Sequence, residues 1–341
     1  MIGPPERRYV VLAEGRFREA KTARGVLRYG TDEVVAVLDS TLAGQTVAGA
    51  MPGLLADPSR DAPIVATLEE ALGHGPTSIL VGVAPAGGRL PAEWMEVLRG
   101  ASEAGLEIVA GLHQRLASAF PETRVWDVRE PPPEVPIFSG EGFGVGAKVA
   151  LTVGTDAAIG KMTASLEIRR AADRAGVSTA FAPTGQTGII IAGWGVCVDA
   201  VVSDFVAGVS EMLVVEAAKS SPDLILVEGQ GALSHPAYSG VTLGLLHGSC
   251  PDCLILCVSP DDSPGYAGVS RPTPARAARL YEEVSALVKP APVVAVSANT
   301  QGLPDDQARA FVEKVSDETG LPAADPFRQP AEPILNAVLE G

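Results

Sequence analysis

The first part of the chain alternates short apolar runs with longer amphipathic stretches. The apolar runs predict strands at 9–12, 34–38, 78–83 and 106–110. The amphipathic stretches at 16–29 and 94–104 have helical spacing, and Gly30 is placed to end the first of these helices. Strands that alternate with helices are typical of a parallel sheet covered on both faces, so we expect a doubly wound α/β domain here.

The same alternation continues in the second part of the chain. Apolar runs predict strands at 148–153, 178–182, 224–227, 253–258 and 293–296. Helices are expected at 161–175 and from Tyr238 to about His247. A buried helix is expected at about 199–219. A second parallel sheet follows from this pattern.

A stiff, extended segment separates the two parts. Pro131-Pro-Pro-Glu-Val-Pro136 is extended, and a glycine-rich stretch at 140–146 follows it. A chain of 341 residues also exceeds the usual size of one domain. We therefore predict a Rossmann-like N-terminal domain at 1–133 and a second α/β domain at 134–341.

The strand at 148–153 leads into a phosphate-binding loop. Gly154 and Gly160 let backbone curl closely around a ligand, and the helix that follows offers unpaired N–H groups at its start. Lys161 adds a charge that reaches outer phosphates. A phosphate-loop, NTPase-like C-terminal domain is predicted. The alternative is a glycine-bearing turn that binds nothing.

This loop departs from the consensus Gly-x-x-x-x-Gly-Lys-Ser/Thr at two positions. Thr155 stands where the first glycine belongs, and Met162 stands where a hydroxyl would bind magnesium, with Thr163 one residue later. A thioether is a poor magnesium ligand, so the loop is expected to hold phosphates rather than to hydrolyse a nucleotide. The predicted cofactor-binding residues are Gly154, Thr155, Asp156, Ile159, Gly160, Lys161, Met162, Thr163 and Asn299.

The net charge of the chain limits the kinds of molecule that it is expected to bind. The net charge is −15 and the isoelectric point is about 4.7, so attraction to nucleic acid or to an anionic membrane is not expected. No secretory leader pattern and no apolar run of membrane-spanning length is present, and a cytoplasmic protein with a small-molecule substrate is expected.

Three of the four cysteines lie close together, at Cys250, Cys253 and Cys257, with His247 upstream. One Cys-x-x-Cys pair with a histidine is compatible with a metal site. Cys253 and Cys257 also fall in an apolar strand, where cysteine behaves as a small hydrophobic residue. We expect no metal there.

Polar residues follow two further strands of the second domain. Glu228 ends the strand at 224–227, and strand ends in such sheets face the ligand crevice. His235 lies in the loop just beyond it, and we prefer it to His247 as a site residue. The predicted substrate-binding residues in this domain are Thr184, Gln186, Thr187, Tyr238 and Ser239.

Three other residues have two interpretations each. Asn299 follows the last strand and either reads the edge of a nucleotide base or else caps the next helix or makes a turn. Arg328 is either a carboxylate clamp or a surface residue. Asp39 ends a strand of the first domain, where it meets a ribose or simply opens a loop; without Gly-x-Gly-x-x-Gly after the first strand, a dinucleotide role is weak.

Two resemblances follow from these motifs. Gly154-Thr-Asp-Ala-Ala-Ile-Gly-Lys161 and Val227-Glu-Gly-Gln-Gly231 are similar to elements of dethiobiotin synthetase that bind ATP and magnesium. More specifically, Gly160-Lys-Met-Thr163, Thr184-Gly-Gln-Thr-Gly188, Val227-Glu-Gly-Gln-Gly231 and the segment from His235 to Gly248 together resemble the D-glutamate N-acetyltransferase family. This second resemblance extends to Lys21-Thr-Ala-Arg-Gly25 and Gly111-Leu-His113 in the first domain, so it covers nearly the whole chain.

The resemblance implies acetyl transfer from acetyl-CoA to the amine of D-glutamate. Glu228 or His235 would take the proton of the amine, and backbone N–H groups at 229–231 or 184–188 would bind the oxyanion. Lys161, Arg24 or Arg328 would pair with substrate carboxylates. Glu228, His235 and Lys161 are the predicted catalytic residues.

Two other classes of protein remain open. In an ATP- and magnesium-dependent ligase or kinase, Lys161 and Glu228 would serve phosphate and metal, with Thr163 as the hydroxyl ligand. A regulator that binds a nucleotide without catalysis explains the phosphate loop but not the number of polar loops. A homo-oligomeric state is compatible with an acetyltransferase, with a ligase or kinase, and with a regulator.

Overall fold

The computed structural model describes residues 6–83, 89–260 and 265–341 of the chain. The chain divides into two compact units. Unit 1 comprises Met1–Pro131 and Gln186–Cys197, and unit 2 comprises Pro132–Gly185 and Val198–Gly341. Each unit is built around a six-stranded parallel sheet, which confirms the prediction of two parallel-sheet α/β domains.

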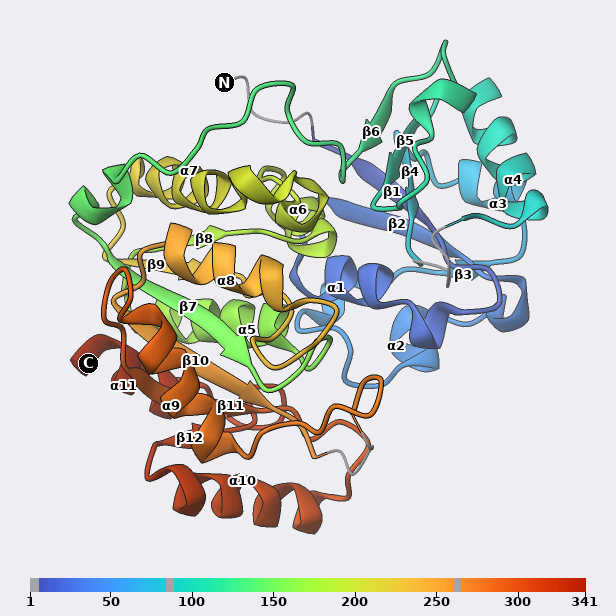
Figure 1. Cartoon of the computed structure of the whole chain (residues 1–341). Coiled ribbons are helices and arrows are strands. Elements are labelled where there is room, and N and C mark those ends of the chain that lie inside the picture. The colour runs from blue at the N-terminus through green and yellow to red at the C-terminus, as the bar shows by residue number, and fades with distance from the viewer. Residues whose placement is uncertain (1–5, 84–88, 261–264) are drawn as a thin grey trace. The chain divides into compact units, whose positions relative to one another are not determined.

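The sheet of unit 1 has the order β3-β2-β1-β4-β5-β6, which is the strand order of the Rossmann fold (Figure 1). Its strands are β1 (Arg8–Leu12), β2 (Glu33–Leu38), β3 (Ile64–Val65), β4 (Ser78–Val81), β5 (Glu107–Ala110) and β6 (Val125–Asp127). Its connecting helices are α1 (Lys21–Tyr29), α2 (Val47–Ala50), α3 (Leu68–Leu72) and α4 (Ala92–Glu103). The very short β3, α2 and α3 escaped the sequence analysis because their apolar runs are too brief to show a period.

A helix from the middle of the sequence completes unit 1. This helix, α6 (Gln186–Ala192), packs on α1, and the Oγ1 atoms of Thr187 and Thr22 are 3.0 Å apart. Arg129, which follows β6, donates to Oε1 of Gln186 at 3.1 Å. Because α1 and Arg129 both follow carboxyl ends of strands, α6 lies at the edge where a Rossmann domain receives its dinucleotide. The protein's own helix packs there instead.

A single boundary between residues 133 and 134 does not describe these units, because the chain enters unit 1 a second time over Gln186–Cys197. The apolar run at 189–191 is buried, as its composition predicts. Burial follows from hydrophobicity, but the sheet against which a segment is buried does not.

The sheet of unit 2 has the order β12-β11-β10-β7-β9-β8 (Figure 1). Its strands are β7 (Lys148–Gly154), β8 (Thr179–Ala182), β9 (Leu224–Val227), β10 (Cys253–Val258), β11 (Val293–Ala298) and β12 (Ala323–Ala324). Its helices are α5 (Lys161–Arg174), α7 (Val206–Ala218), α8 (Ser239–Gly248), α9 (Pro274–Ser285), α10 (Asp305–Thr319) and α11 (Glu332–Glu340). Right-handed crossovers place α5 on one face, where it packs on α11, and α7 to α10 on the other, where α7 packs on α8.

Two predicted helices differ from the observed ones. The helix predicted at 16–29 is broken at Ala20, because the N–H of buried Phe17 is held by Asp39 Oδ2 at 3.1 Å in a separate turn. Asp39 thus ends β2 as a loop-opening residue. The helix predicted at 199–219 begins only at Val206, since Val198 first bonds back to Thr184 O at 3.0 Å as the chain returns from α6.

Across the described ranges, we find no helix with the length and apolar character needed to span a membrane.

Candidate functional site

The predicted site residues of unit 2 lie on loops at the carboxyl edge of its sheet. The phosphate loop follows β7, Glu228 follows β9, and Asn299 follows β11. The N–H of Thr155 donates to Cys257 O at 3.2 Å, and Nδ2 of Asn299 donates to Ile159 O at 3.2 Å. The phosphate loop after β7 is therefore in direct contact with the end of β10 and with the loop after β11.

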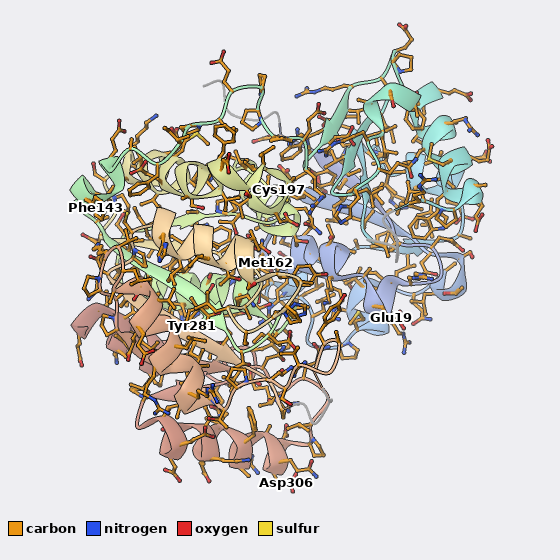
Figure 2. The ribbon with its side chains drawn as sticks, in the orientation of Figure 1. Glu19, Phe143, Met162, Cys197, Tyr281 and Asp306 are labelled. Atoms are coloured by element: carbon orange, nitrogen blue, oxygen red, sulfur yellow. The ribbon has the colours of Figure 1, made fainter. Side chains whose placement is uncertain are left out.

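The phosphate loop has the backbone that its glycines predict. Gly160 has a φ of 101° and is the last residue before α5, and a Cβ on Gly154 would lie 3.2 Å from Cys257 O. The first turn of α5 contains Lys161 and Met162, and Figure 2 labels the second of these. Thr163 follows in the same turn and is half-buried. The unpaired N–H groups at the start of this 14-residue helix form a positive end suited to an anion.

The Lys161 ammonium lies inside this loop. Its side chain is 6% exposed, and Nζ donates to Asp156 O at 2.7 Å. Burial lowers the pKa of Lys161 to about 8, although Cys257, Asp156 and Glu228 act in the opposite direction. A phosphate group bound in the loop would offer this buried charge a stronger acceptor than a carbonyl oxygen.

Glu228 is a buried carboxylate held by the backbone of the neighbouring loop. Its Oε2 accepts the N–H groups of Thr184 and Gly185 at 3.0 and 3.1 Å. None of the described residues donates to its Oε1. Burial raises the pKa of Glu228 to about 7; the two N–H groups lower it, Asp199 raises it and Lys161 lowers it. A carboxylate with this pKa is suited to take up and release a proton near neutrality.

Two glycines near Glu228 lie in close packing, against backbone at Gly229 and against a side-chain amide at Gly185. A Cβ on Gly229 would lie 1.6 Å from Thr152 O, on the adjacent strand β7. The Gly229 N–H donates to Thr152 Oγ1 at 2.9 Å. A Cβ on Gly185 would lie 2.2 Å from Nε2 of Gln230. Only hydrogen fits at both positions without movement of neighbouring atoms.

Asp156 of the phosphate loop connects to two further groups. Its Oδ2 forms an ion pair with Arg271, which follows β10, and its Oδ1 lies 3.7 Å from Nε2 of His235. Nδ1 of His235 accepts the N–H of Ala237 at 3.2 Å, so the neutral ring carries its proton on Nε2, facing Asp156. In this tautomer, Nε2 of His235 is a hydrogen-bond donor.

The His235 ring is packed between two tyrosines. The Tyr238 ring stacks on it with centroids 4.5 Å apart, and the Tyr266 ring lies 4.7 Å away and tilted. Both tyrosines are exposed, at 48% and 55%, whereas His235 is 7% exposed. Ser239 follows Tyr238 as the first residue of α8, and its N–H donates to His235 O at 3.0 Å.

The structure does not gather all predicted substrate residues in unit 2. Thr184 lies there, where its Oγ1 donates to Glu228 O at 2.6 Å. Gln186 and Thr187 belong to unit 1 and bond to Arg129 and Thr22 as described above. The motif at 184–188 therefore divides after Gly185, which sequence spacing could not reveal.

Two predicted arginines and Asn299 have partners of their own. Arg24 lies on α1 of unit 1 and its Nη1 donates to Arg18 O at 3.4 Å. Nη2 of Arg328 donates to Thr300 O and Leu303 O, which pins the turn after β11.

The Asn299 amide is engaged on both sides. Besides its bond to Ile159 O, its Oδ1 accepts the N–H of Gln301 at 3.1 Å. The turn-forming interpretation thus has a geometric basis, and Asn299 also holds the phosphate loop in place. Its contact with a base stays a prediction.

Sequence reasoning missed three residues at this site: Arg271, Tyr266 and Tyr281. The first two lie in a polar, glycine-containing loop after a predicted strand, which was a usable signal. Tyr281 lies within α9 and carried no signal.

The clustered cysteines are buried thiols. Cys253 and Cys257 lie on β10, and Cys250 Sγ donates to His247 O at 3.6 Å. Burial raises the pKa of Cys250 and Cys253 to about 11 and that of Cys257 to about 12, which disfavours the thiolate that binds metal. Within the described ranges, no three His, Cys, Asp or Glu residues are grouped as a metal site requires.

We predict that protein purified without added metal contains none at this cluster. Elemental analysis should give much less than one zinc or iron per chain, because the thiols stay protonated at neutral pH. Stoichiometric zinc, lost in a Cys253→Ser variant but kept in Cys197→Ser, would contradict this prediction; Cys197 is the buried cysteine of unit 1.

Comparisons with known proteins agree with this architecture. The P-loop domain model of DUF1611, described as a domain of unknown function, matches residues 136–335, and the family's Rossmann-like domain model matches residues 40–131. A crystal structure of a DUF1611 family protein from Anabaena variabilis, at 2.30 Å resolution, is 36% identical with a TM-score of 0.90. The superposition covers 98% of this chain and 100% of the Anabaena variabilis chain.

Two curated relatives are each named D-glutamate N-acetyltransferase. One, from Pseudoalteromonas sp, is 36% identical over 278 residues, 78% of this chain and 82% of the relative. The other, from Tritonibacter scottomollicae, is 38% identical over 289 residues, 80% of this chain and 84% of the relative. These matches confirm the resemblance inferred from the motifs, and this chain belongs to the DUF1611 family, with its Rossmann-like N-terminal and P-loop C-terminal domains.

Proposed function

We propose that this protein is an N-acetyltransferase that moves the acetyl group of acetyl-CoA to the amine of D-glutamate. The observation that carries the proposal is a buried carboxylate, Glu228, with a pKa near 7, in the same unit as a phosphate loop that has methionine at its magnesium position. We take the identity of the transferred acyl group and of the accepting amine from the names of the two curated relatives.

The phosphate loop is the proposed site of the donor. CoA carries a pyrophosphate and a ribose phosphate, and an anion at the start of α5 would meet N–H groups and the Lys161 ammonium without a metal ion. Met162 offers no oxygen ligand, which is why we favour a phosphate-holding role over nucleotide hydrolysis.

Glu228 is the proposed general base. The ammonium of the amino acid must lose a proton before its nitrogen attacks the thioester carbonyl, and Oε1 of Glu228 is the oxygen left to accept it. His235 is less suited, because its Nδ1 already accepts an N–H and its Nε2 carries the proton. The nitrogen then loses its second proton, and collapse of the tetrahedral intermediate breaks the C–S bond. The departing sulfur takes up the proton that Glu228 accepted, so that CoA leaves as a thiol.

Backbone groups near Glu228 are the proposed oxyanion donors. The N–H groups of Thr184, Gly185 and Gly229 are already used within the loops. Those of Gln230 and Gly231 donate to no residue in the part of the chain that the structure describes, and we assign the oxyanion to them.

The partners that we propose are small molecules alone. The net charge of −15 disfavours nucleic acid and anionic membranes as partners. A cytoplasmic location and a homo-oligomeric state remain predictions.

The decisive assay follows release of free thiol from acetyl-CoA. We expect release with D-glutamate, and less with L-glutamate or D-aspartate, with no need for ATP and magnesium. Thiol release with a different amine alone would preserve the chemistry and overturn the substrate. ADP formation from ATP without thiol release would instead support a ligase or kinase, and calorimetric binding of ATP without turnover would support a regulator.

Lys161→Ala should weaken CoA binding by about 1–3 kcal/mol, the range for losing a charge-assisted hydrogen bond. Isothermal titration calorimetry with CoA measures this. Lys219→Ala is a matched control, since that lysine is 67% exposed and pairs with Glu216. Equal CoA affinity in the Lys161 variant and the control would place the donor elsewhere.

A further inference from the structure

Tyr281 joins two of the site loops through one buried hydroxyl group. The residue lies on α9, is 1% exposed, and is labelled in Figure 2. Its hydroxyl donates to Gly154 O at 2.8 Å and accepts the Leu233 N–H at 3.1 Å; the Gly154 N–H lies 3.4 Å away. Gly154 opens the phosphate loop, and Leu233 lies in the loop that carries Glu228 and His235.

We infer that Tyr281 is a positioning residue, whose hydroxyl sets the spacing between the phosphate loop and the Glu228–His235 loop. This inference rests on the proposed function, because it assigns the donor to the first loop and the base to the second.

The chemistry of the contact supports this role. The partners are backbone groups, so they cannot turn to another partner by a change of side-chain rotamer, and they move only if a loop shifts. Burial raises the pKa of Tyr281 to about 12, so the hydroxyl keeps its proton and remains both donor and acceptor at neutral pH. The loops also touch directly, since Ser234 Oγ donates to Thr155 O at 3.3 Å, but that contact is only half-buried.

Tyr281→Phe tests the inference because it removes the hydroxyl and keeps the ring. We expect the Kd for CoA to rise by about 5–10-fold and kcat to fall by about 10-fold or more, since a buried carbonyl and N–H lose their partner and a small misplacement of reacting groups is costly. Tyr9→Phe is the matched control, a fully buried tyrosine on β1 of unit 1, and should leave both values within about twofold.

Two further measurements separate positioning from loss of folded protein. Thermal unfolding and the stoichiometry of CoA binding both report the fraction of folded protein. At the assay temperature, we expect Tyr281→Phe to be folded and to bind close to one CoA per chain. In a Lys161→Ala background, the added effect of Tyr281→Phe on CoA affinity should shrink, because both changes act on the same loop.

The outcomes distinguish the two proposals. If the native protein neither binds CoA nor releases thiol, the proposed function fails. If it does both, and Tyr281→Phe keeps the native Kd and kcat, Tyr281 has no positioning role. A lower kcat that only mirrors a lower folded fraction would make Tyr281 a stability residue.

Discussion

Glu228→Gln should reduce turnover by about 10²–10⁴-fold while CoA affinity stays within about twofold. Glutamine keeps the size of the side chain and an oxygen for the Thr184 and Gly185 N–H groups, but it cannot take up a proton. A loss confined to kcat would identify an interaction made in the transition state.

The dependence of activity on pH in the native protein is a second test of Glu228 as the general base. A base must be ionised, so kcat/KM should rise with pH through about 7, the pKa of Glu228 in the fold. This acidic limb should be absent from the residual activity of Glu228→Gln. The measurement is thiol release from acetyl-CoA between about pH 5 and 9.

Stability should respond to pH with a definite sign. The pKa of Glu228 is raised in the fold from its ordinary 4.5 to about 7, so between these values the folded state binds more protons than the unfolded state. The contribution of this group is therefore fully present below about pH 4.5 and declines as pH rises through 7. Relative to the native protein, Glu228→Gln should gain stability over this window.

Glu211→Gln is the matched control. Glu211 lies on α7, is 3% exposed, and accepts the backbone N–H groups of Ser139 and Gly142. These donors belong to the segment before β7 and not to the loops at the strand ends. That variant should keep the acidic limb. If Glu228→Gln also keeps the limb and full turnover, Glu228 is not the base and His235 becomes the candidate.

Gly229→Ala should lower the free energy of unfolding of unit 2 by about 1–3 kcal/mol. We also expect it to abolish CoA binding. The new Cβ would lie 1.6 Å from Thr152 O, so the backbone of β7 or of the Glu228 loop must shift. Such a shift also lengthens the bond between the Gly229 N–H and Thr152 Oγ1, which ties that loop to the strand preceding the phosphate loop. Urea-induced unfolding and CoA calorimetry measure the two effects.

Gly240→Ala is the control for this change. Gly240 lies on α8, where a Cβ would meet nothing within 4 Å. Alanine favours a helix over glycine by up to about 1 kcal/mol, so this variant should be as stable as the native protein or more stable. Native stability in Gly229→Ala would show that the loop can yield at little cost.

Much of the fold follows from local sequence. The strands at β2 and β10 were predicted within a residue, because unbroken apolar runs of that length are buried strands whatever their surroundings. The phosphate loop was equally accessible, since glycine spacing and a following helix are local features.

Partnerships among site residues were less accessible. Glu228 was found because it ends an apolar strand, but its bonds to the Thr184 and Gly185 N–H groups join residues more than 40 positions apart. Arg271 and Tyr281 reach the phosphate loop across still longer separations, so no spacing rule could place them.

The sequence by itself determined the two α/β sheets, the phosphate loop and its missing magnesium hydroxyl, because each depends on the identity and order of adjacent residues. The tertiary structure alone decided that the motif at 184–188 divides, with Gly185 donating to Glu228 and Gln186 packing into unit 1. It also decided that burial brings the pKa of Glu228 to about 7. Hydrophobicity specifies that a segment is buried, whereas its partners and its dielectric surroundings are set by residues distant in sequence.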